Sequence, residues 1–288
     1  MRGKVCVLIL FCSFFVINLQ SQEVYIRGYI GQTYYQGDLS PVTSIFSFSE
    51  GHPALGFYAG AHVTESITLG ARFIKGHISG YDNESFYKWK LERNLHFESP
   101  VYEFGLVTEF YLNRHFESLK RFGLNIYITS GLNVFRFEPK ALLGGKEVKL
   151  ADLSTEGQGL KAYPDKKPYS KTQISIPLGI GFSFNIADNF QLGFEVGPRM
   201  TFTDYLDDVS SFYVDPEVLT LARGENAALV ADRRWEVITH DNSVDVAGKQ
   251  RGNAANNDWY LYTGVHFGYV ISNKKKVVKK ERPTRPKF

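Results

Sequence analysis

Residues 172–186 read TQISIPLGIGFSFNI and carry the clearest structural signal in the chain. Every second position is apolar: Ile174, Ile176, Leu178, Ile180, Phe182, Phe184 and Ile186. The positions between them are small or polar: Ser175, Pro177, Gly179, Gly181, Ser183 and Asn185. A period of two residues predicts a β-strand whose two faces meet different environments. No helical period of comparable length competes with it anywhere in the chain.

The same alternation recurs along the sequence and predicts eight strands in all. They cover residues 23–31, 53–63, 67–76, 100–112, 122–136, 172–186, 190–203 and 259–271. The links after the second, fourth and sixth strands are short: 64–66, 113–121 and 187–189. The links after the first, third, fifth and seventh strands are long: 32–52, 77–99, 137–171 and 204–258.

Alternating short and long links are typical of an up-and-down barrel in an outer membrane, which has short periplasmic turns and long extracellular loops. We therefore predict an all-β protein, an eight-stranded antiparallel transmembrane β-barrel with long extracellular loops. An even number of strands returns both chain ends to the periplasm. The aromatic content of 15% suits the aromatic girdles of such a barrel.

The two faces of the predicted strands distinguish a membrane barrel from a soluble one. One face of the predicted strands consists almost entirely of apolar side chains, whereas the other face is rich in Gly, Ser, Thr, Asn and Tyr and carries most of the charged residues. A soluble, lipocalin-like barrel would put the apolar set inside, but the interior of eight strands is too narrow for so many large side chains. We therefore expect the apolar face to meet lipid. Closure of the barrel then pairs every backbone polar group.

The N-terminal segment has the features of a secretory signal peptide. Arg2 and Lys4 precede an apolar run that ends at Leu19, and a small residue, Ser21, follows. The run is too short for a helical membrane span, and no later stretch is long enough. Both cysteines, Cys6 and Cys12, lie within it, so the mature chain would have no disulfide. The predicted organisation is a signal peptide at 1–22, the barrel at 23–272 and a basic periplasmic tail at 273–288.

Four charged residues of the inner face are expected at similar heights in the lumen: Arg27, Arg72, Glu109 and Glu195. One interpretation is a polar conduction path. The other is a packed charge network that fills the lumen, which we favour because charges in so narrow an interior must be paired.

The longest loop begins with clustered carboxylates: Asp204, Asp207, Asp208 and, further on, Asp215. Such a cluster could hold Ca²⁺, but the spacing of an EF-hand is missing, and capping and turn roles are more common for Asp. No catalytic or phosphate-binding motif is present in the sequence. We therefore predict no enzymatic activity, no metal and no cofactor.

The last segment is strongly basic. Eight Lys and Arg residues follow position 272, among them Lys274, Lys275, Lys276, Lys279 and Lys280, and only Glu281 opposes them. Residues 22–272 carry 23 basic and 29 acidic side chains, so a basic tail is attached to an acidic body. The tail is either a solvated end or a docking segment for an acidic periplasmic partner or an anionic lipid. Nucleic acid is not an expected partner in the periplasm.

Several segments resemble the PorG-like outer-membrane barrels of the Bacteroidota. They include residues 35–39 (YQGDL), 155–159 (TEGQG), 173–179 (QISIPLG), 203–210 (TDYLDDVS), 231–233 (ADR), 250–252 (QRG) and 258–260 (DWY), in this order along the chain. The resemblance implies a component of the type IX secretion system that works with a periplasmic ring of the PorK and PorN type. The basic tail departs from the family pattern. A free-standing structural or ligand-binding barrel and a small channel are the alternatives.

Overall fold

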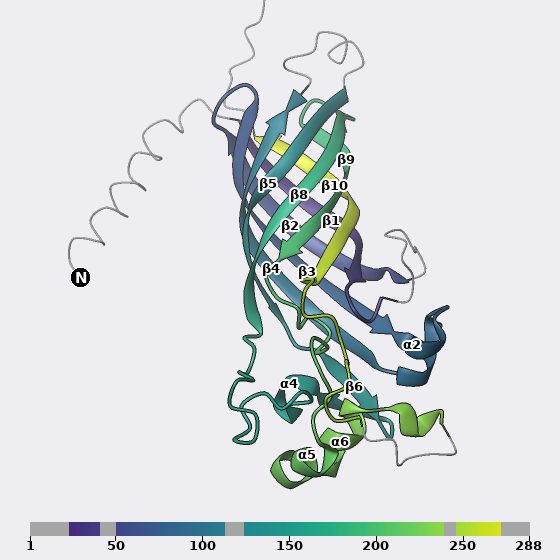
Figure 1. The fold of residues 1–288 in the computed structure, drawn as a ribbon. Coiled ribbons are helices and arrows are strands. Elements are labelled where there is room, and N and C mark those ends of the chain that lie inside the picture. The colour runs from purple at the N-terminus through teal and green to yellow at the C-terminus, as the bar shows by residue number, and fades with distance from the viewer. Residues whose placement is uncertain (1–22, 41–49, 113–123, 239–245, 272–288) are drawn as a thin grey trace, which may run out of the picture.

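The computed structural model describes residues 23–40, 50–112, 124–238 and 246–271, and it is a closed β-barrel with a folded region at one end (Figure 1). The eight barrel strands are β1 (Val24–Gln36), β2 (His52–His62), β3 (Ile67–Tyr81), β4 (His96–Tyr111), β5 (Leu124–Phe137), β8 (Thr172–Asn185), β9 (Phe190–Thr201) and β10 (Trp259–Ile271). Each pairs antiparallel with its neighbour, and β1 pairs with β10 from Val24↔Ile271 to Gln36↔Trp259. The predicted eight-stranded up-and-down barrel is confirmed.

The strands are longer at the loop end than their alternation predicts. β1 continues to Gln36 rather than ending at Gly31, β3 continues to Tyr81 rather than Gly76, and β4 begins at His96. The extra residues lack an apolar outward face because they lie beyond the apolar part of the wall. They remain in the sheet because each neighbouring strand still offers partners for their N–H and C=O groups. β9 is shorter than predicted and ends at Thr201.

The long links form a compact region, called here the loop cap. It comprises residues 37–40, 82–95, 138–171, 202–238 and 246–258. Its elements are η3 (Asp82–Glu84), α2 (Lys88–Arg93), β6 (Lys140–Leu143), β7 (Lys146–Lys149), α4 (Leu150–Leu153), α5 (Pro216–Arg223), α6 (Glu225–Ala231) and η5 (Arg234–Glu236). All of them lie at the end of the barrel opposite Val24 and Ile271 (Figure 1). Between β2 and β3 and between β8 and β9, at the other end, the links are short.

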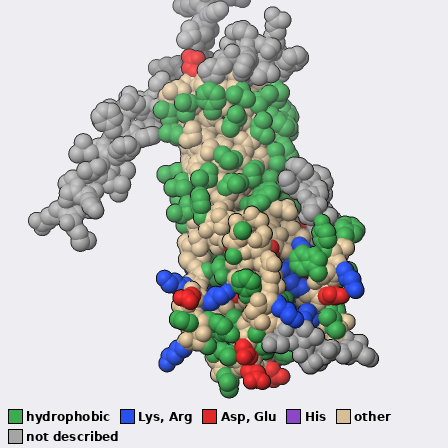
Figure 2. All heavy atoms as spheres, viewed as in Figure 1, with side chains coloured by type: hydrophobic (Ala, Val, Ile, Leu, Met, Phe, Trp, Pro, Cys, Tyr) green, Lys and Arg blue, Asp and Glu red, His purple; other side chains and the backbone are tan. Residues whose placement is uncertain are grey.

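The outer wall of the barrel is apolar and the inner wall is polar. Figure 2 shows hydrophobic side chains spread over the barrel wall and charged side chains gathered at the loop cap. Phe57 is 68% exposed on the outside, whereas the rings of Tyr29, Tyr58 and Tyr127 are buried inside. The lipocalin-like alternative, which needs the apolar face inside, is therefore wrong.

Among the described residues, no helix is both long enough and apolar enough to cross a bilayer.

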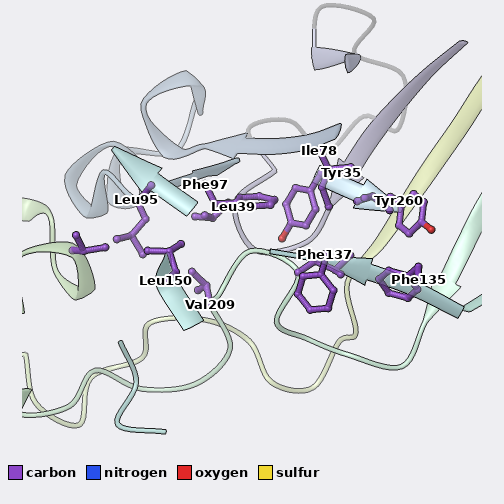
Figure 3. Packing of buried hydrophobic residues seen from close by; sticks show 14 residues of the cluster. Tyr35, Leu39, Ile78, Leu95, Phe97, Phe135, Phe137, Leu150, Val209 and Tyr260 are labelled. Carbon is purple, nitrogen blue, oxygen red and sulfur yellow. The ribbon is translucent and has the colours of Figure 1, made fainter. Parts of the chain in front are cut away.

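The loop cap and the barrel rim share one hydrophobic core (Figure 3). Strand residues Tyr35, Ile78, Phe97, Phe135 and Tyr260 pack together with cap residues such as Leu39, Leu95, Leu150, Leu206, Val209 and Val230. Full burial of each such side chain contributes about 1.5–3 kcal/mol. The core therefore fixes the loops over the mouth of the barrel, which the packed side chains fill.

Candidate functional site: the barrel lumen and the loop cap

Arg27 on β1 forms a buried ion pair with Glu109 on β4, and both side chains are almost completely inaccessible to solvent. The two terminal nitrogens of the guanidinium each donate to one carboxylate oxygen, and the Nη2–Oε2 distance is 3.0 Å. The hydroxyl of Tyr111 accepts a hydrogen bond from Arg27 and donates one to Glu109. A bidentate geometry of this kind offsets much of the cost of removing two charges from water.

A second pair joins Arg72 on β3 to Glu195 on β9, with 2.6 Å between Nη1 and Oε1. A third joins Arg199 on β9 to Glu103 on β4 at 3.2 Å, and the hydroxyl of Tyr260 donates to the same Glu103 carboxylate at 2.7 Å. The alternation of the strands places Glu103 and Arg199 on the inner face, but the network predicted from the sequence does not include them.

The three pairs make the charged part of the lumen electrically neutral. The four residues predicted to form the network do meet in the lumen, where they form two separate pairs that a third pair accompanies. Large side chains fill the space between them, including the buried Tyr29, Tyr58 and Tyr262. This arrangement is a filled interior, as expected where eight strands leave just enough room for their own side chains.

A second buried polar group lies in the loop cap, around Asp207 and Asp258. The hydroxyl of Tyr35 is 2.5 Å from an oxygen of Asp207 and 3.2 Å from an oxygen of Asp258. The backbone amides of Leu39 and Val209 donate to Asp207, and the backbone amide of Leu206 donates to Asp258. Burial raises the pKa of both carboxyls well above the usual range, and each carboxyl also lies near other acidic groups that act in the same direction.

Asp208 and Glu156 are held by different partners from those of Asp207. Arg251 donates to Glu156 at 3.0 Å, and the carboxylate of Glu156 also accepts from the backbone of Ser210. Asp208 accepts hydrogen bonds from Thr155 and from Tyr169. Burial raises the pKa of Asp208 to about 6, although nearby Arg251 acts in the opposite direction.

Arg93, at the end of α2, connects this helix to the rest of the loop cap. It forms a bidentate pair with Asp82, with distances of 2.6 and 2.7 Å, and donates to the backbone carbonyl of Arg251 at 2.5 Å. The ammonium of Lys90 donates to the carbonyls of Asp38 and Ser40, each at 2.8 Å. The segments that follow β1, β3 and β9 are therefore held together by buried cations.

The predicted acidic cluster of Asp204, Asp207, Asp208 and Asp215 is distributed over separate positions. Asp215 is the N-cap of α5 and accepts from the backbone of Glu217 at 2.8 Å. Burial raises the pKa of Asp204 to about 7. In the part of the chain that the structure describes, no group of three or more His, Cys, Asp or Glu side chains could hold a metal ion.

Residues from widely separated short segments meet in the loop cap. Asp38, Glu156, Arg251 and Asp258 belong to four of the segments that carry the family resemblance, and the side chains of all four form hydrogen bonds within the loop cap. None of these four residues was predicted from the sequence to form a site. In the sequence, these four residues are distinguished only as charged residues that lie next to a glycine or an aromatic residue in the predicted loops. The predicted signal peptide at 1–22 and the basic tail from Lys274 to Lys280 lie outside the described residues.

The apolar outer wall, the closed sheet and the filled polar interior define an eight-stranded transmembrane β-barrel of the bacterial outer-membrane class, since only closed barrels and helices span lipid. A family model described as "Domain of unknown function (DUF6089)" matches residues 2–224, and the chain belongs to this family. A search of curated proteins finds no sequence that matches.

Several solved barrels are similar to the chain at low sequence identity. Neisserial surface protein A has 8% identity and a TM-score of 0.38, and the match covers 86% of this chain and 96% of that one. Ail of Yersinia pestis has 9% identity and a TM-score of 0.40, with 87% and 99% covered. OprG of Pseudomonas aeruginosa has 10% identity and a TM-score of 0.40, with 88% and 97% covered. The fold assignment rests on the strand pairing of the chain itself.

Proposed function

We propose that this protein is a non-enzymatic outer-membrane barrel of the type IX secretion system that anchors or positions a periplasmic ring. The observation that carries the proposal is the filled, charge-neutral lumen beneath a hydrophobic core at the barrel mouth. A barrel built in this way offers no path wide enough for a protein cargo. Its contribution to secretion is then mechanical, through its position in the membrane.

The resemblance to PorG-like barrels supplies the secretion system and the partner. The ring would consist of PorK- and PorN-like subunits, and the other partner is the lipid of the outer membrane, which contacts the apolar wall. The ring would meet the end of the barrel where β1 begins and β10 ends. Among the described residues, the short links between β2 and β3 and between β8 and β9 lie at this end, and the predicted basic tail would add a charged segment for contact.

Recovery of partners from native membranes tests the proposal. The tagged full chain is extracted in mild detergent and its partners are identified by mass spectrometry. We expect periplasmic ring subunits in stoichiometric amounts, and a barrel of similar size expressed with the same tag serves as the control. Recovery of the barrel alone would instead favour a free-standing structural or ligand-binding barrel.

The small-channel alternative is tested by conductance in planar bilayers. We expect no stable steps from the purified barrel, because the three ion pairs and the inner tyrosines occupy its interior. A porin purified in the same detergent provides the positive control. Reproducible porin-sized steps from this protein would contradict the proposed mechanical role.

A further inference from the structure

A polar pocket of about 450 Å³ lies in the loop cap between α2 and residues 250–253. Trp89 of α2 forms one part of its wall, and Asp38, Gln250 and Asn253 contribute polar groups. Neither the lumen pairs nor the partners of Asp207 involve this pocket directly. Its volume lies toward the lower end of the range for small-ligand pockets.

The ring of Trp89 is held in place although its side chain is 56% exposed. The charged ends of Lys90 and Arg93 lie 5.5 and 5.1 Å from its centroid. Lys90 is fixed by a buried hydrogen bond to the carbonyl of Ser40, and Arg93 by one to the carboxylate of Asp82. A rigid, accessible indole beside hydrogen-bonding groups is a platform for a ligand with one apolar face and several hydroxyls, and a saccharide ring has this character.

The cations that line the pocket already have partners in the protein, so a ligand would be held there through its hydroxyls and not through an anionic group. Arg93 is paired with Asp82 and Arg251 with Glu156. Lys90 donates to two backbone carbonyls and lies near Asp38. The side-chain amide of Gln250 donates to the carbonyl of Gly252, and that of Asn253 accepts from the backbone of Ala255. The Oε1 atom of Gln250 and the Nδ2 atom of Asn253, both on exposed residues, are therefore the atoms best placed to bond neutral hydroxyls.

An apolar groove of about 800 Å³ adjoins the polar pocket, and Gly37 and Asp38 line both. Its apolar wall consists of outward-facing residues at the loop end of the barrel: Ile176, Leu178, Met200, Phe202 and Trp259. Asn256 and Asn257 lie on its polar side. The groove continues the lipid-facing surface of β8 and β9, so a hydrocarbon chain of the bilayer can enter it without leaving an apolar environment.

We propose that the pocket and the groove together bind a saccharide-bearing lipid of the outer leaflet. The sugar stacks on Trp89 and bonds the amides beside it, while an acyl chain lies against Met200 and Phe202. This assignment rests on the proposed orientation, in which the loop cap is extracellular. The shared boundary at Gly37 and Asp38 is the feature that makes one ligand with two chemical parts fit better than two separate ligands.

The test uses the full chain in phospholipid nanodiscs and two probes. One probe is lipopolysaccharide purified from the bacterium that makes this chain, and the other is the oligosaccharide released from it by mild acid. Trp89→Ala removes the platform, and Trp235→Ala is its matched control, because Trp235 is 44% exposed on the loop cap and lines neither cavity. Phe202→Ala alters the groove, and Phe190→Ala at the other end of β9 is its control.

We expect Trp89→Ala to weaken the binding of both probes about five- to tenfold, which is the range of an aromatic contact. Phe202→Ala should weaken only lipopolysaccharide, and both controls should bind as the wild type does. Unchanged affinity of Trp89→Ala for both probes would overturn the saccharide site. Equal affinity of the wild type for both probes would overturn the lipid as the source of the sugar.

Two further measurements keep these outcomes distinct. Heat-modifiable migration on gels verifies that every variant is folded. Recovery of periplasmic ring subunits is measured on the same variants and should not change, because the pocket lies at the opposite end of the barrel from the ring. A variant that loses sugar binding but recovers the ring subunits as the wild type does therefore tests the saccharide site without testing the proposed role in secretion.

Discussion

Arg72 on β3 and Glu195 on β9 form a hydrogen-bonded ion pair of 2.6 Å across the lumen, between strands that lie four positions apart in the closed order of eight. They therefore connect opposite walls of the barrel. Arg27–Glu109 and Arg199–Glu103 each connect strands three positions apart. The three ion pairs join residues that are distant in sequence. Because each pair has one Arg and one Glu, the charges in the lumen cancel, and the paired side chains occupy the interior together with the inner tyrosines.

Removing one member of a lumen pair should destabilise the barrel more than removing both. Arg72→Met leaves Glu195 buried with a charge that the barrel no longer balances, and the expected loss is about 3–5 kcal/mol. The double variant Arg72→Met with Glu195→Gln removes both charges and should recover a large part of that loss. Urea unfolding in lipid vesicles measures each. A double variant no more stable than the single one would mean that the pair does not act as a unit.

A charge on the outer wall should be costly only where lipid covers the wall. Ile180 on β8 is 52% exposed on the apolar face, and Ile180→Arg should cost about 2–4 kcal/mol if the residue lies near the bilayer midplane. Leu221→Arg on α5 is the control, since this residue is 89% exposed on the loop cap. Folding into bilayers is the measurement. Equal tolerance of the two substitutions would place Ile180 outside the membrane.

The loop cap should be more stable at mildly acidic pH than at neutral pH. The pKa values of Asp204, Asp207, Asp208 and Asp258 are all raised in the folded cap, to about 7 for Asp204 and about 6 for Asp208. The folded cap therefore binds more protons than the unfolded one between pH 4 and 7, and its stability falls as the pH rises through this window.

Hydrogen exchange, corrected for the intrinsic pH dependence of the rate, tests this expectation. Peptides that cover residues 204–211 should be better protected at pH 5 than at pH 7.5. Asp204→Asn removes one of the titrating groups and should reduce the difference. Protection that increases with pH would show that the carboxylates are stabilised in their charged form.

The predicted basic tail should contribute to docking and not to folding. Removal of residues 273–288 should preserve heat-modifiable migration, because β10 already ends at Ile271. It should weaken recovery of the ring subunits. Wild-type recovery should fall toward that of the truncated protein as salt rises from about 0.1 to 1 M, since screening shortens the range of exposed charges from about 10 to 3 Å.

A variant whose tail keeps its length but loses its lysine charges distinguishes the effect of charge from the effect of length. Replacing Lys274, Lys275, Lys276, Lys279 and Lys280 by Gln should reproduce the effect of truncation on ring recovery. If the truncated protein failed to insert, the tail would have a role in assembly. If it inserted and retained its partners fully, the ring would contact the short links or the barrel wall instead.

The sequence by itself determined the barrel, its strand number and its inside and outside. Alternation with a period of two is a local property, and a residue such as Leu178 or Ser183 is assigned to a face by its position in the strand alone. The lengths of the links then fixed the topology. The strand ends at Gln36 and Tyr81 were missed because, beyond the apolar wall, nothing in the side chains marks where pairing stops.

Only the tertiary structure decided which charges meet and what the loops become. Arg72 and Glu195 are brought together by the curvature and stagger of the closed sheet, and no spacing along the chain records that distance. Asp38, Glu156, Arg251 and Asp258 lie in separate loops, and their contacts exist because the hydrophobic core at the rim holds those loops against one another. Local pattern specifies strands, but long-range pairing and burial depend on closure, which no single segment of sequence contains.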